Sequence, residues 1–251
     1  MKEDKDIISF FLFVFSLSFT FFHIVPTFLP GILKKPLTWG DTIDFLTPLA
    51  VIPLAFLIYV RVRKALIAQD LLGSSPRILR ILGQVLLSLG FLSYVDGHGL
   101  HLASNSIARL LQDMKHSELF SATYLFDEII SHLMLDGGAF LLSVGLILFT
   151  SKLSFKSLSC KNLVFISLGA AFYGFTFTAN CIEGQTVIVY FPAAVIGFLV
   201  SLIIYSRGRK QSLHNPVLLF FLGGYFLSVL LFSYWGISHT GFPQFSELGW
   251  I

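Results

Sequence analysis

Seven stretches of this chain are apolar enough and long enough to cross a bilayer as helices, and no other feature constrains the fold as strongly. Crossing about 30 Å of hydrocarbon takes roughly 20 apolar residues in a helix. The stretches lie at about 7–32, 42–60, 78–95, 133–150, 162–181, 186–206 and 216–237. We therefore predict an all-α, polytopic membrane helix bundle in which residues 1–251 form a single integral membrane domain.

The composition supports the same class. Only 12% of the residues are charged, and the mean hydropathy is +0.80. A soluble domain carries roughly 25% charged residues. These values exclude an ordinary cytosolic globule, a disordered tail and a nucleic-acid binder. The first apolar stretch follows MKEDKD, is too long for a signal-peptide core and lacks a small-x-small cleavage site, so we interpret it as a retained helix.

The distribution of basic residues predicts the orientation. One predicted side of the bundle carries thirteen of the 17 Lys and Arg residues: Lys2, Lys5, Arg61, Arg63, Lys64, Arg77, Arg80, Lys152, Lys156, Lys161, Arg207, Arg209 and Lys210. By the positive-inside rule this side is cytosolic, which puts the N-terminus inside and the C-terminus outside. We expect the cell (cytoplasmic) membrane. Cys160 and Cys181 then lie at opposite sides and cannot form a disulfide within one chain.

The third stretch continues into the polar segment YVDGHGLHLASNSIARLLQD. His98 and His101 are three residues apart and share a helical face, which Asn105 extends by one turn. Neutral imidazole is a common ligand for Zn, Fe and Cu. Gly97 and Gly99 bracket His98 and favour a kink or a close approach by another helix.

The fourth stretch begins with a second polar pattern. Tyr124, Glu128, His132 and Asp136 are spaced four apart and are predicted to form one stripe, with Asp127 beside it. The last two members of the stripe fall in or beside the apolar run LMLDGGAFLLSVGLILF. Ionisable groups in such a run normally face a cavity or a partner and mark function.

A short polar turn around Met114–Glu118 joins these two segments, which predicts an outer helical hairpin that extends helices three and four. Facing positions in the hairpin then sum to about 230. This register places His98 opposite His132, and His101 opposite the turn that contains Asp127. Histidines and a carboxylate are therefore expected to converge near the outer membrane boundary.

Other polar residues fall at the same outer level. His239 ends the seventh stretch and His23 lies in the outer half of the first, so each is a further candidate ligand. Asp41 and Asp44 open the second helix, where carboxylates interact favourably with the N-terminal dipole. We expect both to act as helix caps.

These patterns predict a metal-dependent membrane enzyme, specifically a hydrolase that acts at the outer face on a lipid or another membrane-associated small molecule. The expected ligands of the ion, zinc in the first place, are His98, His101, His132 and His239. Glu128 or Asp127, when left uncoordinated, is the expected general base. The residues expected to orient the ligands are Asp96, Asn105, Asp136, Asn180 and Glu183.

The helix count and the use of histidine and aspartate resemble seven-helix membrane hydrolases of the alkaline-ceramidase and adiponectin-receptor type. Those proteins carry an HxxxH pair on the last helix and an SxxxH pair early in the chain. In this sequence the seventh stretch offers only His239, and no SxxxH pair fits. The resemblance therefore does not assign a family.

Three other functions remain open at this stage. The Asp, Glu and His stripes would suit a proton-coupled transporter, although the cytosolic halves of the helices offer few polar groups to continue a path. Facing His98 and His132 would suit haem as axial ligands. The outer hairpin would also suit a binding protein that docks a partner.

Overall fold

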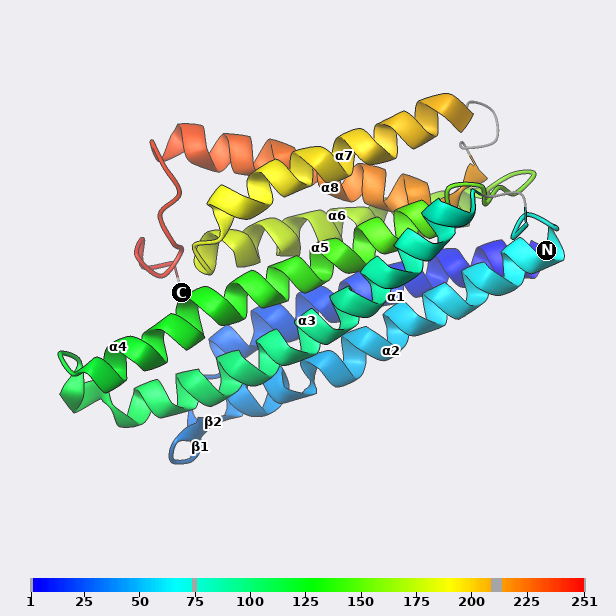
Figure 1. Cartoon of the computed structure of the whole chain (residues 1–251). Helices are drawn as coiled ribbons and strands as arrows, with labels where there is room; N and C mark the ends of the chain where they lie inside the picture. Colours follow the sequence, from blue (N-terminus) through cyan, green and yellow to red (C-terminus); the bar gives the residue numbers. More distant parts are fainter. Residues whose placement is uncertain (1, 74–75, 209–213, 251) are drawn as a thin grey trace.

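The computed structural model describes residues 2–73, 76–208 and 214–250 and contains a bundle of long helices (Figure 1). The α-helices are α1 (Lys2–Ile24), α2 (Trp39–Ala68), α3 (Arg77–Leu110), α4 (Glu118–Tyr124), α5 (His132–Phe149), α6 (Cys160–Glu183), α7 (Val187–Gly208) and α8 (Pro216–Ser238). Two short 3₁₀ helices, η1 (Val25–Phe28) and η2 (Gln112–Met114), and a π-helix, η3 (Leu125–Ser131), accompany them. Seven helical segments are long and apolar enough to cross a membrane, which confirms the predicted all-α class and the number of candidate spans.

Two helix boundaries differ from the predicted ones. The first helix ends at Ile24 rather than near residue 32, because Pro26 turns the chain into the 3₁₀ helix η1. The second helix runs from Trp39 to Ala68, well past the predicted end at residue 60, and contains Pro48 and Pro53. Proline is tolerated in membrane helices, and long cationic side chains near a helix end can extend towards water.

A small antiparallel β-hairpin, β1 (Ile32–Lys34) and β2 (Leu37–Thr38), links α1 to α2. The Asp41 carboxylate accepts from the Thr38 backbone N–H while the Thr38 hydroxyl accepts from the Asp41 N–H, which makes a capping box. The Arg109 guanidinium of α3 donates to both oxygens of Asp41 at 2.5 Å and to the Pro36 carbonyl at 2.8 Å. Asp41 is therefore a helix cap, as predicted, and it also fixes α3 to the hairpin.

Helices α3 and α5 pack antiparallel with their backbones in contact. Gly83, Gly90 and Gly97 recur every seven residues on α3. The first two face glycines of α5, and Gly97 faces Leu135 of α5 and Ser131 of η3. A Cβ atom at Gly90 would lie 2.9 Å from the Gly138 carbonyl oxygen, and one at Gly145 would lie 2.8 Å from the Gly83 carbonyl oxygen. This close approach fixes the register between α3 and the segment that leads into α5.

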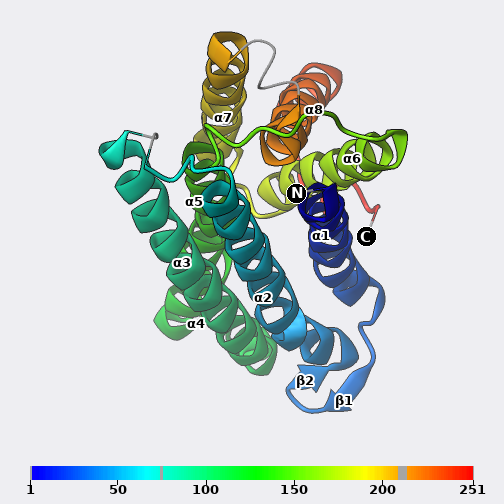
Figure 2. The same ribbon diagram turned by 90° about the vertical axis from the view of Figure 1, so that its right-hand side faces the viewer.

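The other long helices complete the bundle around this pair. α1 packs between α2 and α6, and α8 lies against α6 and α7 (Figures 1 and 2). In the interior, Tyr225 hydrogen-bonds to the Ser143 hydroxyl, and the Tyr173 hydroxyl lies 3.4 Å from that of Tyr225. The β-hairpin and the turn between α3 and α4 mark one end of the bundle, called here the hairpin end, and the N-terminus lies at the other (Figure 1).

Candidate histidine–carboxylate site

Four histidines from three helices come together in the hairpin half of the bundle. The rings of His23 in α1 and His98 in α3 have centroids 5.4 Å apart, and those of His101 in α3 and His132 in α5 have centroids 4.9 Å apart. These four residues are called the histidine cluster. Three of them are predicted ligands, and the fourth, His23, was a weaker candidate because only its depth in the first helix pointed to it.

Two of these histidines lie beside buried carboxylates. His98 Nδ1 is 3.4 Å from Asp44 Oδ1 of α2, and His101 Nδ1 is 3.0 Å from Asp127 Oδ1 of η3. Yet both ring nitrogens of His98, Nδ1 of His101 and Oδ1 of Asp127 are buried without a properly aligned hydrogen bond. Buried polar atoms are nearly always hydrogen-bonded. These atoms therefore have charged neighbours but unused hydrogen-bonding capacity, which a ligand would take up.

The π-helix η3 changes which carboxylate faces the cluster. Its turns are closed by i→i+5 rather than i→i+4 hydrogen bonds, so the angular positions of its residues differ from those of a regular α-helix. Asp127 is buried against α3, whereas Tyr124 is 45% exposed. Glu128 stays half-buried, with Oε2 4.0 Å from His132 Nε2. The structure thus departs from the expected single stripe. Among the carboxylates that contact the histidine cluster, Asp127 is the most buried.

His23 is held in one orientation by its neighbours. Its Nδ1 lies 2.8 Å from the Phe19 carbonyl oxygen, which can only accept, so Nδ1 carries the hydrogen in the neutral ring. Nε2 is then the bare nitrogen, and the Tyr94 hydroxyl donates to it at 3.3 Å. A backbone carbonyl that fixes the tautomer in this way is typical of histidines that bind metal.

Asp44 has a different role from the predicted one. Only Asp41 makes the capping box, while Asp44 lies one turn further into the helix with a side chain 17% exposed. Its Oδ1 accepts from the Thr47 hydroxyl at 3.3 Å and faces His98. The expectation that Asp44 is a cap was therefore wrong. An acid one turn inside an apolar helix is itself a signal of function, which could have identified it.

The α6–α7 turn closes over one side of the cluster. A Cβ atom at Gly184 would lie 2.6 Å from His132 Nδ1, so only glycine leaves room for this ring. One turn deeper in α5, buried Asp136 accepts a 2.5 Å hydrogen bond from the Thr186 hydroxyl. Asp136 is thereby paired with the turn that covers His132 rather than with a histidine.

Two other predicted residues are occupied elsewhere. The ring of His239, at the end of α8, stacks on Trp235 with centroids 3.9 Å apart. Glu183 Oε2 accepts from the backbone N–H groups of Phe245 at 2.8 Å and Ser246 at 3.3 Å. Glu183 therefore holds the C-terminal segment against the bundle, and His239 packs on its own helix.

The remaining residues predicted to orient ligands make no such bond. Asp96 is exposed, and Asn105 and Asn180 are half-buried. Within residues 2–73, 76–208 and 214–250, no hydrogen bond joins any of these three side chains to the histidine cluster. The two cysteines are both free, as predicted, with Cys160 exposed and Cys181 buried.

No protein-family model, curated protein or solved structure matches this chain. What the protein does must therefore be inferred from the chemistry of the site itself.

The imidazole and carboxylate groups at this site are of the kinds that bind divalent transition metals, although they contact one another in pairs. Imidazole nitrogens with one or two carboxylates are the ligands that zinc and iron sites use. Among the residues that the structure describes, no group of three or more His, Cys, Asp or Glu side chains is arranged around one point to hold an ion. Binding would thus require rotation of the side chains. Such a rotation would break the 3.0 Å contact between His101 and Asp127 and the 3.4 Å contact between His98 and Asp44, neither of which is an aligned hydrogen bond.

Proposed function

We propose that this protein is a multi-pass membrane enzyme that uses a divalent metal ion, with zinc preferred, to hydrolyse a lipid or another membrane-associated substrate. The observation that carries the proposal is the set of buried donor atoms on His98, His101 and Asp127 that have a charged neighbour but no aligned hydrogen bond. An unsatisfied buried polar group costs about 1–3 kcal/mol, and more when it is charged. A bound ion would offset this cost for all three side chains at once.

His98, His101 and His132 would hold the ion, with Asp127 as the nearest carboxylate. The Asp44 carboxylate, 3.4 Å from His98 Nδ1, is placed to orient that ring so that Nε2 becomes the ligating atom. His23 Nε2 is a further donor on the same side of the cluster. A divalent ion in such a site acts as a Lewis acid and supports a nucleophile at neutral pH.

Glu128 is the proposed general base. It is the carboxylate next to the cluster with the greatest access to water, with a side chain 33% exposed, and it lies 4.0 Å from His132 Nε2. In ester or amide hydrolysis, the oxygen of water attacks the carbonyl carbon while its proton moves to Glu128. The same proton then passes to the departing alcohol or amine as the acyl bond breaks.

The proposed substrate class and side follow from position. The cluster lies in the half of the spans nearest the hairpin end, so a lipid headgroup or the first bonds of its chains would be at the same depth. The basic residues of the opposite end put the site outside the cell by the positive-inside rule. Arg209 and Lys210, which belong to that basic set, lie outside the described residues.

Elemental analysis of the detergent-purified protein tests the proposal. We expect about one or two metal equivalents in the wild type, purified without chelators, and in the His239→Ala control, whose histidine lies away from the cluster. A folded His98→Ala/His132→Ala variant should lose the metal. Metal-free wild-type protein would contradict the proposal and favour a proton-coupled transporter. An intense Soret band in the optical spectrum would favour a haem protein.

A further inference from the structure

A groove of about 290 Å³ runs along α2 at the end of the bundle opposite the histidine cluster. It is lined by Phe56, Tyr59, Val60, Arg63, Lys64 and Ile67. These positions follow three- and four-residue spacings and therefore share one face of the helix. The groove is about ten times the volume that one water molecule takes up in the liquid, so it holds a headgroup and the first part of a chain rather than a whole lipid.

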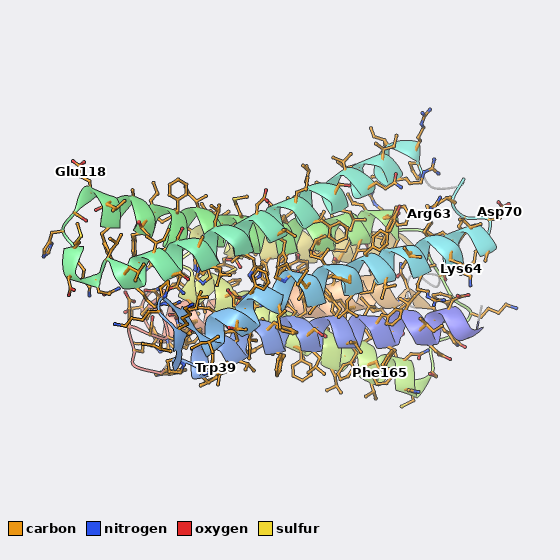
Figure 3. The ribbon with its side chains drawn as sticks, turned by 90° about the horizontal axis from the view of Figure 1, so that it is seen from below. Trp39, Arg63, Lys64, Asp70, Glu118 and Phe165 are labelled. Atoms are coloured by element: carbon orange, nitrogen blue, oxygen red, sulfur yellow. The ribbon has the colours of Figure 1, made fainter. Side chains whose placement is uncertain are left out.

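The groove has a positive end. Arg63 and Lys64 are exposed, and both lie on α2 near its C-terminal end (Figure 3). Within the described part of the chain, neither side chain has a carboxylate at ion-pair distance. The ion pairs of Asp41, Asp44, Asp127 and Glu128 lie in the hairpin half, away from these two cations. Two adjacent cations are thus left to meet an anion from outside the chain.

The rest of the groove is apolar and its floor is fixed. Phe56 is 52% exposed and Val60 is 40% exposed, although both are large apolar side chains. Between them, Tyr59 packs on Phe149 with ring centroids 4.9 Å apart, and its hydroxyl accepts from Gln84 Nε2 at 3.0 Å. Tyrosines in membrane proteins concentrate at the level of the lipid headgroups. The apolar part of the groove then faces the acyl chains.

The charge and apolar pattern together match an amphiphilic anion. Arg63 lies about 6 Å along the helix axis from Tyr59, and Lys64 about 12 Å from Phe56, because each residue adds 1.5 Å. A phosphate at the cations would therefore place its first chain carbons over Val60 and Phe56. Arginine binds phosphate through two parallel N–H groups, and lysine adds a point charge.

We propose that this groove is a binding site for an anionic phospholipid, with the headgroup phosphate on Arg63 and Lys64 and an acyl chain along Val60 and Phe56. The site lies at the opposite end of the bundle from the histidine cluster and does not depend on the proposed enzyme activity. Basic residues next to a membrane surface attract anionic lipids, and the groove adds a defined place for one molecule.

Native mass spectrometry of the detergent-purified full chain tests this assignment. The protein is titrated with phosphatidylglycerol, or with phosphatidylcholine that carries the same chains. We expect the wild type to retain one phosphatidylglycerol with clear preference. R63Q/K64Q should lower that affinity about 30-fold, because each cation near the surface contributes about a factor of five. F56A should weaken binding of both lipids.

A matched control distinguishes binding at this groove from general electrostatic attraction of anionic lipid to the basic end of the bundle. R61Q/R77Q removes the same charge from the same end but replaces no residue that lines the groove. It should retain the preference for phosphatidylglycerol. Equal losses in the two double variants, or equal affinity of the wild type for both lipids, would overturn the proposal. Competition by inorganic phosphate would also overturn it, since it would show an anion site that does not need the chain.

A stability measurement on the wild-type protein tests the site without relying on the folding of any variant. Phosphatidylglycerol should raise the thermal midpoint of wild-type protein in detergent by more than phosphatidylcholine does, because a ligand stabilises the folded state that binds it. The absence of any difference between the two lipids would count against the site even if no variant folded.

Discussion

At the scale of single residues, the contact between Arg109 and Asp41 is shorter than the three histidine–carboxylate contacts of the described structure. It is bidentate, and the Asp41 side chain is only 7% exposed. We expect Arg109→Met to lower the free energy of unfolding by about 1–3 kcal/mol. The change leaves a buried carboxylate without its cation, and the 28% exposure of Arg109 keeps the loss below that of a fully buried pair.

Unfolding of the detergent-solubilised protein by a denaturing detergent measures this loss. Lys115→Met, at an exposed position of the turn after α3, serves as the control and should change stability by less than about 0.5 kcal/mol. Similar losses in the two variants would show that the ion pair contributes nothing beyond a surface charge.

The candidate site shows which residues a sequence can place. His98, His101 and Asp127 are brought together because spacing on one helix and the register of a hairpin are local properties of the chain. Asp44 and His23 come from other helices, and no local spacing relates them to α3. Their positions depend on how α1 and α2 pack against α3. The spacing of residues along one segment does not predict such contacts between helices.

At the scale of elements, the contact between α3 and the segment before α5 depends on Gly97. A Cβ atom there would lie 2.8 Å from the Leu135 backbone nitrogen and 3.0 Å from the Ser131 carbonyl oxygen, whereas Gly99 has nothing within 4 Å. Gly97→Ala should cost about 1–3 kcal/mol, because backbone atoms cannot move aside cheaply. Gly99→Ala should be neutral or stabilising by up to about 1 kcal/mol.

The pair is well matched, since both glycines flank His98 and both changes add one methyl group. Denaturation of each variant gives the stabilities, and the metal content of each shows whether the site survives. The sequence predicted a close approach at these glycines but not which of the two makes it. Equal effects of the two substitutions would contradict the packing of α3 against this segment.

The π-helix η3 is the element that periodicity failed to predict, because the stripe was drawn with α-helical spacing throughout. Deleting Ile130 should restore an α turn in which Asp127 and His132 are four residues apart and still share a face. We therefore expect the deletion variant to retain its metal, as Ile130→Ala should, because the helices on either side keep their register. Loss of the metal in the deletion variant alone would show that the π turn itself positions Asp127. Elemental analysis of both variants, with helix content from circular dichroism, distinguishes a lost site from a lost fold.

At the scale of the whole molecule, hydropathy alone predicted the class and the number of spans, since every backbone polar group in a bilayer must be paired within a helix. It did not predict the β-hairpin between α1 and α2. That hairpin is built from exposed residues whose positions are fixed by Arg109 and Asp41, and such contacts leave no trace in an average of hydrophobicity.

The orientation in the membrane determines on which side the proposed site acts, and the native cysteines can report it. Cys160 is exposed at the start of α6, while Cys181 is buried, so a maleimide reagent has one accessible target. The positive-inside rule predicts that Cys160 is cytosolic. A membrane-impermeant maleimide should therefore label it only after the cells are permeabilised. Lys115→Cys in a Cys160→Ser background should be labelled in intact cells. The reverse pattern would place the histidine cluster at the cytosolic face and would exclude a substrate taken from the outer leaflet.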